Sequence, residues 1–197
     1  PPPASLRAHR IAGQEARSLR LDGLLAEPFW AAAPALTSLI QQEPAEGDPA
    51  TEGTEVRVLF DHENLYVGIL ARDREPDRVV GRILQRDRLM RKDGFTNRPA
   101  FAGDDAVAIL LDPFHDHRNA YVFATNPHGA EFDALLADEG KEFNLDWRGV
   151  WEVAGERTAE GWSAELRIPL RTIRYPSGSA QAWVTGCRWP RAGRGVT

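Results

Sequence analysis

Alternation of apolar and polar residues is the feature that most constrains how this chain can fold. Residues 54–61 (TEVRVLFD) and residues 65–73 (LYVGILARD) both alternate, and only the polar stretch HEN separates them. A period of two places the apolar side chains of a strand on one face. Two such runs around a short polar turn predict a β-hairpin.

The same pattern recurs along the chain and predicts two more hairpins and several single strands. The expected strands are residues 104–112 and 119–126 around the loop PFHDHR, residues 150–158 and 162–169 around AEG, and residues 18–21, 130–136 and 181–189. Short strands at regular spacing, with few helical stretches, are typical of all-β proteins. We therefore predict an antiparallel β-sandwich.

Helical signals are minor. Residues 26–36 contain Pro28 near a possible first helical position and Pro34 as a stop. Residues 74–89 have room for one or two helical turns. Residues 90–103 are polar and are broken by glycine and proline, which predicts a long loop.

The chain has 197 residues, enough for one domain with a substantial core. We expect an N-terminal linker at residues 1–17, the sandwich at residues 18–189 and a C-terminal tail at residues 190–197. The opening PPP suits a linker left after a targeting segment was removed. Cys187 is the single cysteine, so an internal disulfide is impossible and the paired-cysteine zinc patterns are absent.

Charge and hydropathy exclude two classes of partner. The net charge is −5, so the chain lacks the basic balance expected of a nucleic-acid-binding protein. No apolar run approaches the roughly 18 residues that a membrane-spanning helix needs. We therefore expect neither a nucleic-acid partner nor a spanning segment in this chain.

Two histidines and two aspartates gather at the expected tip of the second hairpin. They are Asp112, His115, Asp116 and His117. Imidazole and carboxylate together suit a transition metal. The alternative is a solvated loop in which polar side chains satisfy backbone groups. The sequence favours the loop because no third strong ligand stands at a diagnostic spacing.

Arg118 and Asn126 flank the following strand and offer donors to a polar ligand. Alternatively, Arg118 pairs with Asp116 or Asp105, and Asn126 forms the Asx turn that NPHG predicts.

Four of the six tryptophans lie in segments whose pattern suggests a role. We place Trp30, Trp151 and Trp162 in the core. Trp147 stands in a polar loop with Asn144, Asp146 and Arg148, where its ring could stack on a sugar. The alternative is that Trp147 caps one end of the sandwich.

Catalytic patterns are absent from the sequence. No serine has the nucleophile-elbow context and no phosphate-binding loop is present. Asp104 and Asp105 are adjacent, so on a strand they would point to opposite faces and could not flank one glycosidic bond. Haem is not expected, because Met90 is the only methionine and has no histidine near it.

The order of these segments resembles the family 9 carbohydrate-binding-module-like domains. The resemblance rests on LRLDGLLAEPFW, TEVRVLFDHENLYVGILARD, DDAVAILLD, AYVFATNPHG and GWSAELRIPL, and it spans roughly residues 18 to 185. It implies a sandwich of the DOMON type in an exported protein, as in versions that precede an outer-membrane barrel. It also implies structural calcium, for which Asp112 and Asp116 would supply hard oxygen ligands.

The sugar clamp of that family does not transfer residue by residue. Phe101 or Ala102 stands where the family has one aromatic wall. Ala108 replaces a glutamate, Ala124 lies near the position of an arginine, and Trp189 is the one candidate for the second wall.

We therefore expect a non-catalytic module that binds a glycan or oligosaccharide. Phe101 and Trp147 would stack on the sugar, and Asp105, Arg118, Asn126 and Asn144 would supply polar contacts. The alternative is a structural accessory domain of an outer-membrane barrel protein that binds no sugar. A glycoside hydrolase is a third and weaker hypothesis.

Overall fold

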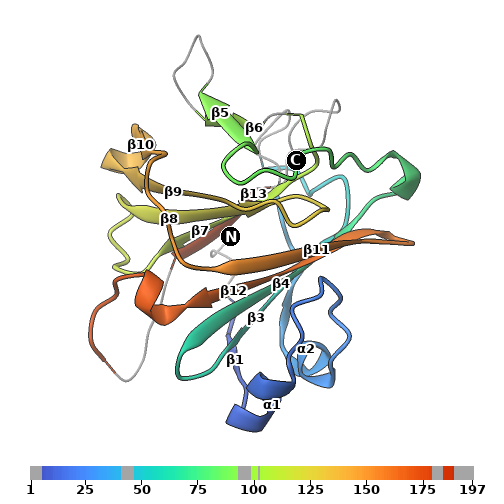
Figure 1. The fold of residues 1–197 in the computed structure, drawn as a ribbon, viewed down its shortest axis with the longest axis horizontal. Helices are drawn as coiled ribbons and strands as arrows, with labels where there is room; N and C mark the ends of the chain where they lie inside the picture. Colours follow the sequence, from blue (N-terminus) through green and yellow to red (C-terminus); the bar gives the residue numbers. More distant parts are fainter. Residues whose placement is uncertain (1–5, 41–46, 93–98, 102, 179–183, 189–197) are drawn as a thin grey trace.

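The structure is a computed structural model, and it describes residues 6–40, 47–92, 99–101, 103–178 and 184–188. Two β-sheets pack as the layers of a sandwich, with two short helices below the first sheet (Figure 1). The predicted β-sandwich is confirmed. None of the described helices is long and apolar enough to cross a membrane.

The first sheet follows the order β1-β3-β4-β12-β11, with β2 on the side of β3. Its pairs are antiparallel except for β1 with β3. The strands are β1 (His9–Arg10), β2 (Ala35–Leu36), β3 (Thr54–Phe60), β4 (Asn64–Arg72), β11 (Glu152–Thr158) and β12 (Gly161–Pro169). The first and third predicted hairpins are therefore confirmed as β3–β4 and β11–β12.

The second sheet follows the order β10-β9-β8-β7-β13 and is antiparallel throughout. Its strands are β7 (Val107–Asp112), β8 (Ala120–Thr125), β9 (Phe132–Ala137), β10 (Glu142–Asn144) and β13 (Val184–Arg188). The second predicted hairpin is confirmed as β7–β8. A separate pair, β5 (Met90–Lys92) with β6 (Pro99–Phe101), lies where a long loop was expected.

The main core lies between the two sheets. Alternate residues of the central strands meet there, such as Ile69 and Leu166 from the first sheet and Ile109 and Phe123 from the second. Trp151 and Trp162 belong to this core, as predicted. The alternation seen in the sequence therefore corresponds to one shared inner face on each sheet.

The outer face of the first sheet is covered by the N-terminal segment. The helices α1 (Gly13–Ser18) and α2 (Pro28–Ala32) lie there, and Trp30 packs with Leu59 and Tyr66. Ile11 is only 2% exposed, and β1 pairs with β3. Residues 9–17, expected in a linker, are thus part of the packed fold, because β1 and Ile11 are held by residues about 50 positions away.

Other elements differ in length from the prediction. Strand 18–21 is absent, since α1 ends at Ser18 and the following residues form no strand. The helix expected at 26–36 shortens to α2, which begins at Pro28. Only η1 (Pro76–Arg78) forms within 74–89, and the remaining short 3₁₀ turns are η2 (Asp138–Gly140) and η3 (Leu170–Thr172).

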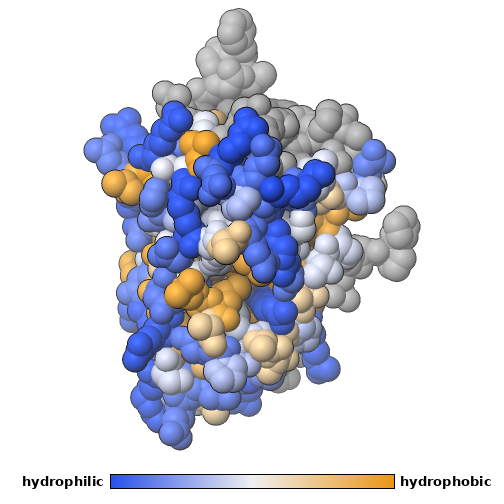
Figure 2. All heavy atoms as spheres, turned by 90° about the vertical axis from the view of Figure 1, so that its right-hand side faces the viewer, coloured by the Kyte–Doolittle hydropathy of each residue, from blue (hydrophilic) through white to orange (hydrophobic). Residues whose placement is uncertain are grey.

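The face in Figure 2 is mostly hydrophilic, with a small gathering of apolar side chains near its centre. Among the described residues, the exposed large apolar residues come from separate parts of the chain: Leu24, Ile40, Leu84, Phe114, Val150 and Tyr175. Single exposed apolar residues are normal on soluble proteins and mark no interface by themselves.

The three buried tryptophans make a matched stability series. Trp30 Nε1 donates to Glu165 Oε1 at 2.9 Å, and Trp151 Nε1 donates to Asp133 Oδ2 at 2.7 Å. Trp162 Nε1 has no hydrogen-bond partner within the described residues. Replacement by phenylalanine should therefore cost about 1–3 kcal/mol more at Trp30 and Trp151 than at Trp162, because only the first two remove a hydrogen bond from a buried carboxylate. Urea denaturation of the three variants measures this, and equal losses would contradict it.

Candidate ligand-binding site

The outer face of the second sheet carries the positions at which the sugar clamp was sought. Ala108 pairs with Ala124 across β7 and β8, and both side chains are buried. Phe101 is partly buried and packs against the same apolar cluster, together with Leu89 and Met90. This face is therefore packed with apolar side chains. Ala102 and Trp189 lie outside the described residues.

Asn126 and Asp105 are committed to the fold. Asn126 Oδ1 accepts hydrogen bonds from the backbone of His128 and Ala130, each at 3.0 Å, as the Asx-turn interpretation predicts. Its Nδ2 donates to Asp104 Oδ2 at 2.8 Å. Asp105 Oδ2 accepts from the backbone of Val80 at 2.6 Å. The sequence predicted that both would contact a ligand. Both are instead buried and hydrogen-bonded within the fold, so that prediction is wrong for these two residues.

The tip between β7 and β8 is organised by its two aspartates. Asp112 accepts backbone hydrogen bonds from Phe114, Asp116 and His117. Asp116 accepts backbone hydrogen bonds from Arg118 and Asn119. The hydrogen bond from the Asn119 side chain has the largest effect in lowering the pKa of the Asp116 carboxyl, and the two backbone bonds lower it further. This geometry matches the loop interpretation.

The two tip histidines lie side by side, with ring centroids 4.9 Å apart. His115 and His117 both have a positive φ, of 55° and 56°. No group of three or more potential ligands in the described part of the chain is placed to hold a metal ion. The calcium site at Asp112 and Asp116 stays a prediction.

Arg118 has other partners than those expected from the sequence. Its guanidinium lies 3.6 Å from Asp138 and 3.9 Å from Glu139, at the turn between β9 and β10. The backbone of Arg118 donates to Asp116 Oδ1 at 2.7 Å and the charge of Arg118 helps to lower the pKa of Asp116. Among the described residues, the Arg118 guanidinium forms ion pairs with Asp138 and Glu139 and not with Asp116 or Asp105. Asn126 lies at the opposite end of β8, roughly 20 Å away for a six-residue strand, so Arg118 and Asn126 do not converge on one ligand.

Trp147 lies against the edge of the main core. Its ring contacts Tyr121 and Phe123, with centroids 5.3 and 5.9 Å away. This position agrees with the alternative in which Trp147 caps one end of the sandwich. Asn144, in β10, accepts a hydrogen bond from the backbone of Asp146 at 3.0 Å, which shapes the loop that leads to Trp147.

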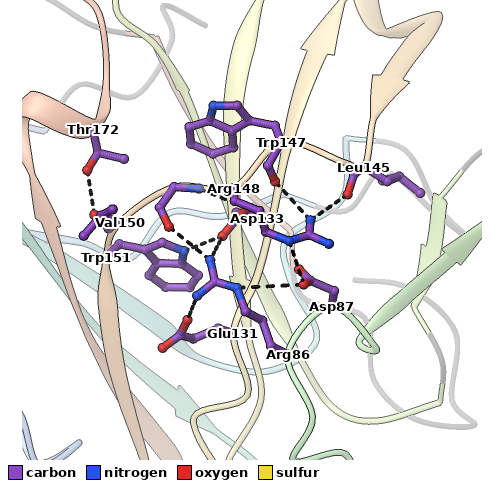
Figure 3. A network of polar contacts seen from close by, with 11 residues as sticks. Arg86, Asp87, Glu131, Asp133, Leu145, Trp147, Arg148, Val150, Trp151 and Thr172 are labelled. Atoms are coloured by element: carbon purple, nitrogen blue, oxygen red, sulfur yellow. Dashed lines mark hydrogen bonds and ion pairs between the residues drawn. The ribbon is translucent and has the colours of Figure 1, made fainter.

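A polar network lies beneath this loop (Figure 3). Arg86 bonds to Glu131, to Asp133 and to the carbonyl of Gly149, and Arg148 pairs with Asp87 at 3.2 Å. Asp133 is fully buried. Burial raises the pKa of Asp87 and of Glu131. Because the network joins residues 86–87, 131–133 and 148–151, it fixes the Trp147 loop to β9.

A groove of about 790 Å³ lies at the end of the sandwich where β3 turns into β4 and where β12 ends. Its polar and aromatic lining consists of His62, Glu63, Asn64, Arg171, Arg174 and Tyr175. The volume is within the range of small-molecule sites. This groove was not predicted from the sequence, although RTIRYPSG places two arginines and a tyrosine within five residues of one another.

Backbone hydrogen bonds hold the two walls of the groove. Asp61 Oδ1 accepts from the backbone of Glu63 and Asn64, each at 2.7 Å, which forms the β3–β4 turn. Leu170 donates to the carbonyl of Glu63 at 2.7 Å. On the other side, the backbone of Arg174 donates to the Tyr121 hydroxyl at 3.0 Å. The groove is therefore preformed, and its side chains project from a fixed backbone.

Comparison with solved structures identifies the fold. A family 9 carbohydrate-binding module from Caldicellulosiruptor kristjanssonii in complex with cellotriose matches with a TM-score of 0.59 and 13% identity, over 96% of this chain and 81% of that one. A family 9 module from the same organism in complex with glucose matches with a TM-score of 0.55 and 12% identity, over 96% of this chain and 82% of that one. The chain has the fold of these modules.

A third structure supports the same fold assignment. It is a protein from Bacteroides uniformis that is described as a candidate carbohydrate-binding protein. It matches with a TM-score of 0.57 and 11% identity, over 92% of this chain and 81% of that one. No protein-family model matches the sequence, and the search of curated proteins gives no match.

Proposed function

We propose that this chain is a non-catalytic carbohydrate-binding module. The observation that carries the proposal is the fold shared over 96% of the chain with a module that holds cellotriose. Folds alone do not fix function, so the proposal also needs a site. The groove at the β3–β4 turn provides one, whereas the outer face of the second sheet is packed with apolar side chains.

The groove has the chemistry that sugar recognition requires. Tyr175 is 38% exposed and can offer an apolar ring face to the C–H groups of a pyranose. Glu63 carries a planar carboxylate that can accept from two hydroxyls, and Asn64 can offer its amide oxygen while its Nδ2 donates to the Tyr66 hydroxyl at 3.3 Å. A few polar groups around one aromatic surface are typical of preformed small-molecule sites.

A glycan array followed by calorimetry tests the proposal. We expect at least one saccharide to bind, and Tyr175→Ala to weaken that binding about tenfold or more, because aromatic contacts dominate such interfaces. Phe114→Ala is the matched control, since Phe114 is another exposed aromatic residue, 51% exposed, and lies outside the groove. Retained affinity in Tyr175→Ala would remove the groove as the site, and a negative array would contradict the function.

A second candidate is the structural accessory domain of an outer-membrane barrel protein. The apolar filling of the outer face of the second sheet favours it, since that is where the family's clamp was sought. A negative array together with co-purification of a barrel partner would support this function. Both candidates imply an exported protein, and cell fractionation with an antibody against this chain tests that part.

A further inference from the structure

Arg171 and Arg174 differ from the arginines of the other large cavity in having no charged partner among the residues that the structure describes. At the opposite cavity, Arg72 pairs with Glu55 at 2.6 Å and with Glu160 at 3.0 Å, and Arg74 pairs with Glu52 at 2.9 Å. Within the described residues, the guanidinium groups of Arg171 and Arg174 make no ion pair or hydrogen bond. Two cationic donors thus face one groove unneutralised.

The charge of the groove is positive although that of the chain is negative. Among the described residues, Glu63 is the only carboxylate that lines the groove. Its side chain is 72% exposed, and its Oε1 lies 3.4 Å from His62 Nε2. The chain as a whole carries −5. A local positive groove on an acidic protein selects an anionic ligand over the neutral one.

We propose that this groove binds an acidic saccharide, with a ring carboxylate bound by Arg171 and Arg174 and the sugar ring against Tyr175. The inference rests on the proposed carbohydrate-binding function and names the substrate class. Guanidinium groups bind carboxylates through two parallel N–H···O hydrogen bonds, which neutral hydroxyls cannot match. The aromatic ring distinguishes a sugar from a simple anion, because only the sugar presents an apolar C–H face.

Calorimetry with matched ligands tests the proposal. The probes are glucuronic acid and oligogalacturonate, with glucose and a neutral oligosaccharide of equal length as uncharged counterparts and sodium acetate as a simple carboxylate. The uronates should bind at least about tenfold more tightly than the neutral sugars, the increment of one charge-assisted hydrogen-bonded pair. Their affinity should also fall as salt is raised from 50 to 500 mM.

Variants locate the charge. Arg171→Gln and Arg174→Gln should each weaken uronate binding about tenfold and leave neutral-sugar binding nearly unchanged. Arg174→Lys should weaken uronate binding less than Arg174→Gln, because lysine keeps the positive charge but lacks the two parallel N–H donors of the guanidinium. Arg88→Gln is the control, since Arg88 is exposed and lies outside the groove. The Arg174 variants leave its backbone bond to Tyr121 intact, and melting temperatures verify the fold.

Each other outcome identifies what is wrong. Equal affinity for uronates and neutral sugars would overturn this inference and leave the carbohydrate-binding function standing. Acetate that binds as tightly as glucuronic acid would overturn it in favour of a simple anion site. Uronate binding that survives both glutamine variants would place the acidic sugar elsewhere. No binding of any sugar would overturn the proposed function and this inference together.

Discussion

Replacing Asp133 by alanine is expected to lower the free energy of unfolding by about 2–4 kcal/mol, the cost of leaving buried N–H donors without an acceptor. Asp133 is fully buried on the inner face of β9. Its carboxylate accepts from Trp151 Nε1, from the backbone of Gly149 at 3.3 Å and from Arg86. Alanine leaves the N–H groups of Trp151 and Gly149 without an acceptor, whereas Arg86 keeps Glu131 and the carbonyl of Gly149.

Glu131→Gln is the matched control for this prediction. Glu131 pairs with the same Arg86 but its side chain is 29% exposed, so water replaces the lost contact. We expect its loss to stay below about 1 kcal/mol, as is usual for exposed ion pairs. Urea denaturation compares the two variants. A loss at Asp133→Ala as small as that at Glu131→Gln would show that the buried network contributes little.

Stability is expected to fall as pH rises from 4.5 to about 7, because of Glu165. Burial raises the pKa of this carboxyl from 4.5 to about 7, against the opposing effect of hydrogen bonds from Gly23, Asp22 and Trp30. Between these pH values the folded state binds more protons than the unfolded state. The free energy of unfolding therefore decreases with rising pH, by about 3 kcal/mol at 1.36 kcal/mol per pKa unit, and is flat above pH 7.

Other carboxyl groups with shifted pKa values also change the stability with pH. The Arg72 hydrogen bond to Glu55 lowers the pKa of that carboxyl, so its contribution is present above its ordinary pKa and is lost in stronger acid. Glu131 and Asp87 have raised pKa values and act in the same direction as Glu165. The stability maximum is therefore expected at mildly acidic pH.

Denaturation at pH 5 and pH 8 measures the effect in wild type and in Glu165→Gln. The amide does not titrate, so the variant should lose most of the difference between the two pH values. It should also be less stable at pH 5, because one amide oxygen cannot serve all three N–H donors. Glu142→Gln, an exposed glutamate, is the control and should keep the wild-type difference. An unchanged difference in Glu165→Gln would contradict the assignment.

The sandwich could be predicted from the sequence because its signal is local. A period of two is fixed by strand geometry, so β3, β4, β7, β8 and β12 were identified without knowledge of their neighbours. Trp30, Trp151 and Trp162 were placed in the core because each stands inside a patterned element, and all three are buried. Where the local signal was weak, as in β1, β5 and β6, the prediction missed strands that exist only through their partners.

The polar residues could not be assigned because their roles depend on distant partners. Asn126 was a ligand candidate until Asp104 and the carbonyl of Ile83 were seen to occupy its amide. Arg118 pairs with a turn about 20 residues away. A sequence shows that a side chain can bond, but not whether the fold has already provided its partner.

The sequence by itself determined that this chain pairs short strands into two layers, because alternation is imposed within each strand. Only the tertiary structure decided which faces remain open. Apolar residues fill the outer face of the second sheet. The β3–β4 turn and residues 169–175, more than 100 positions apart in sequence, line one groove. Contacts of that range depend on how both sheets pack, and no local pattern encodes them.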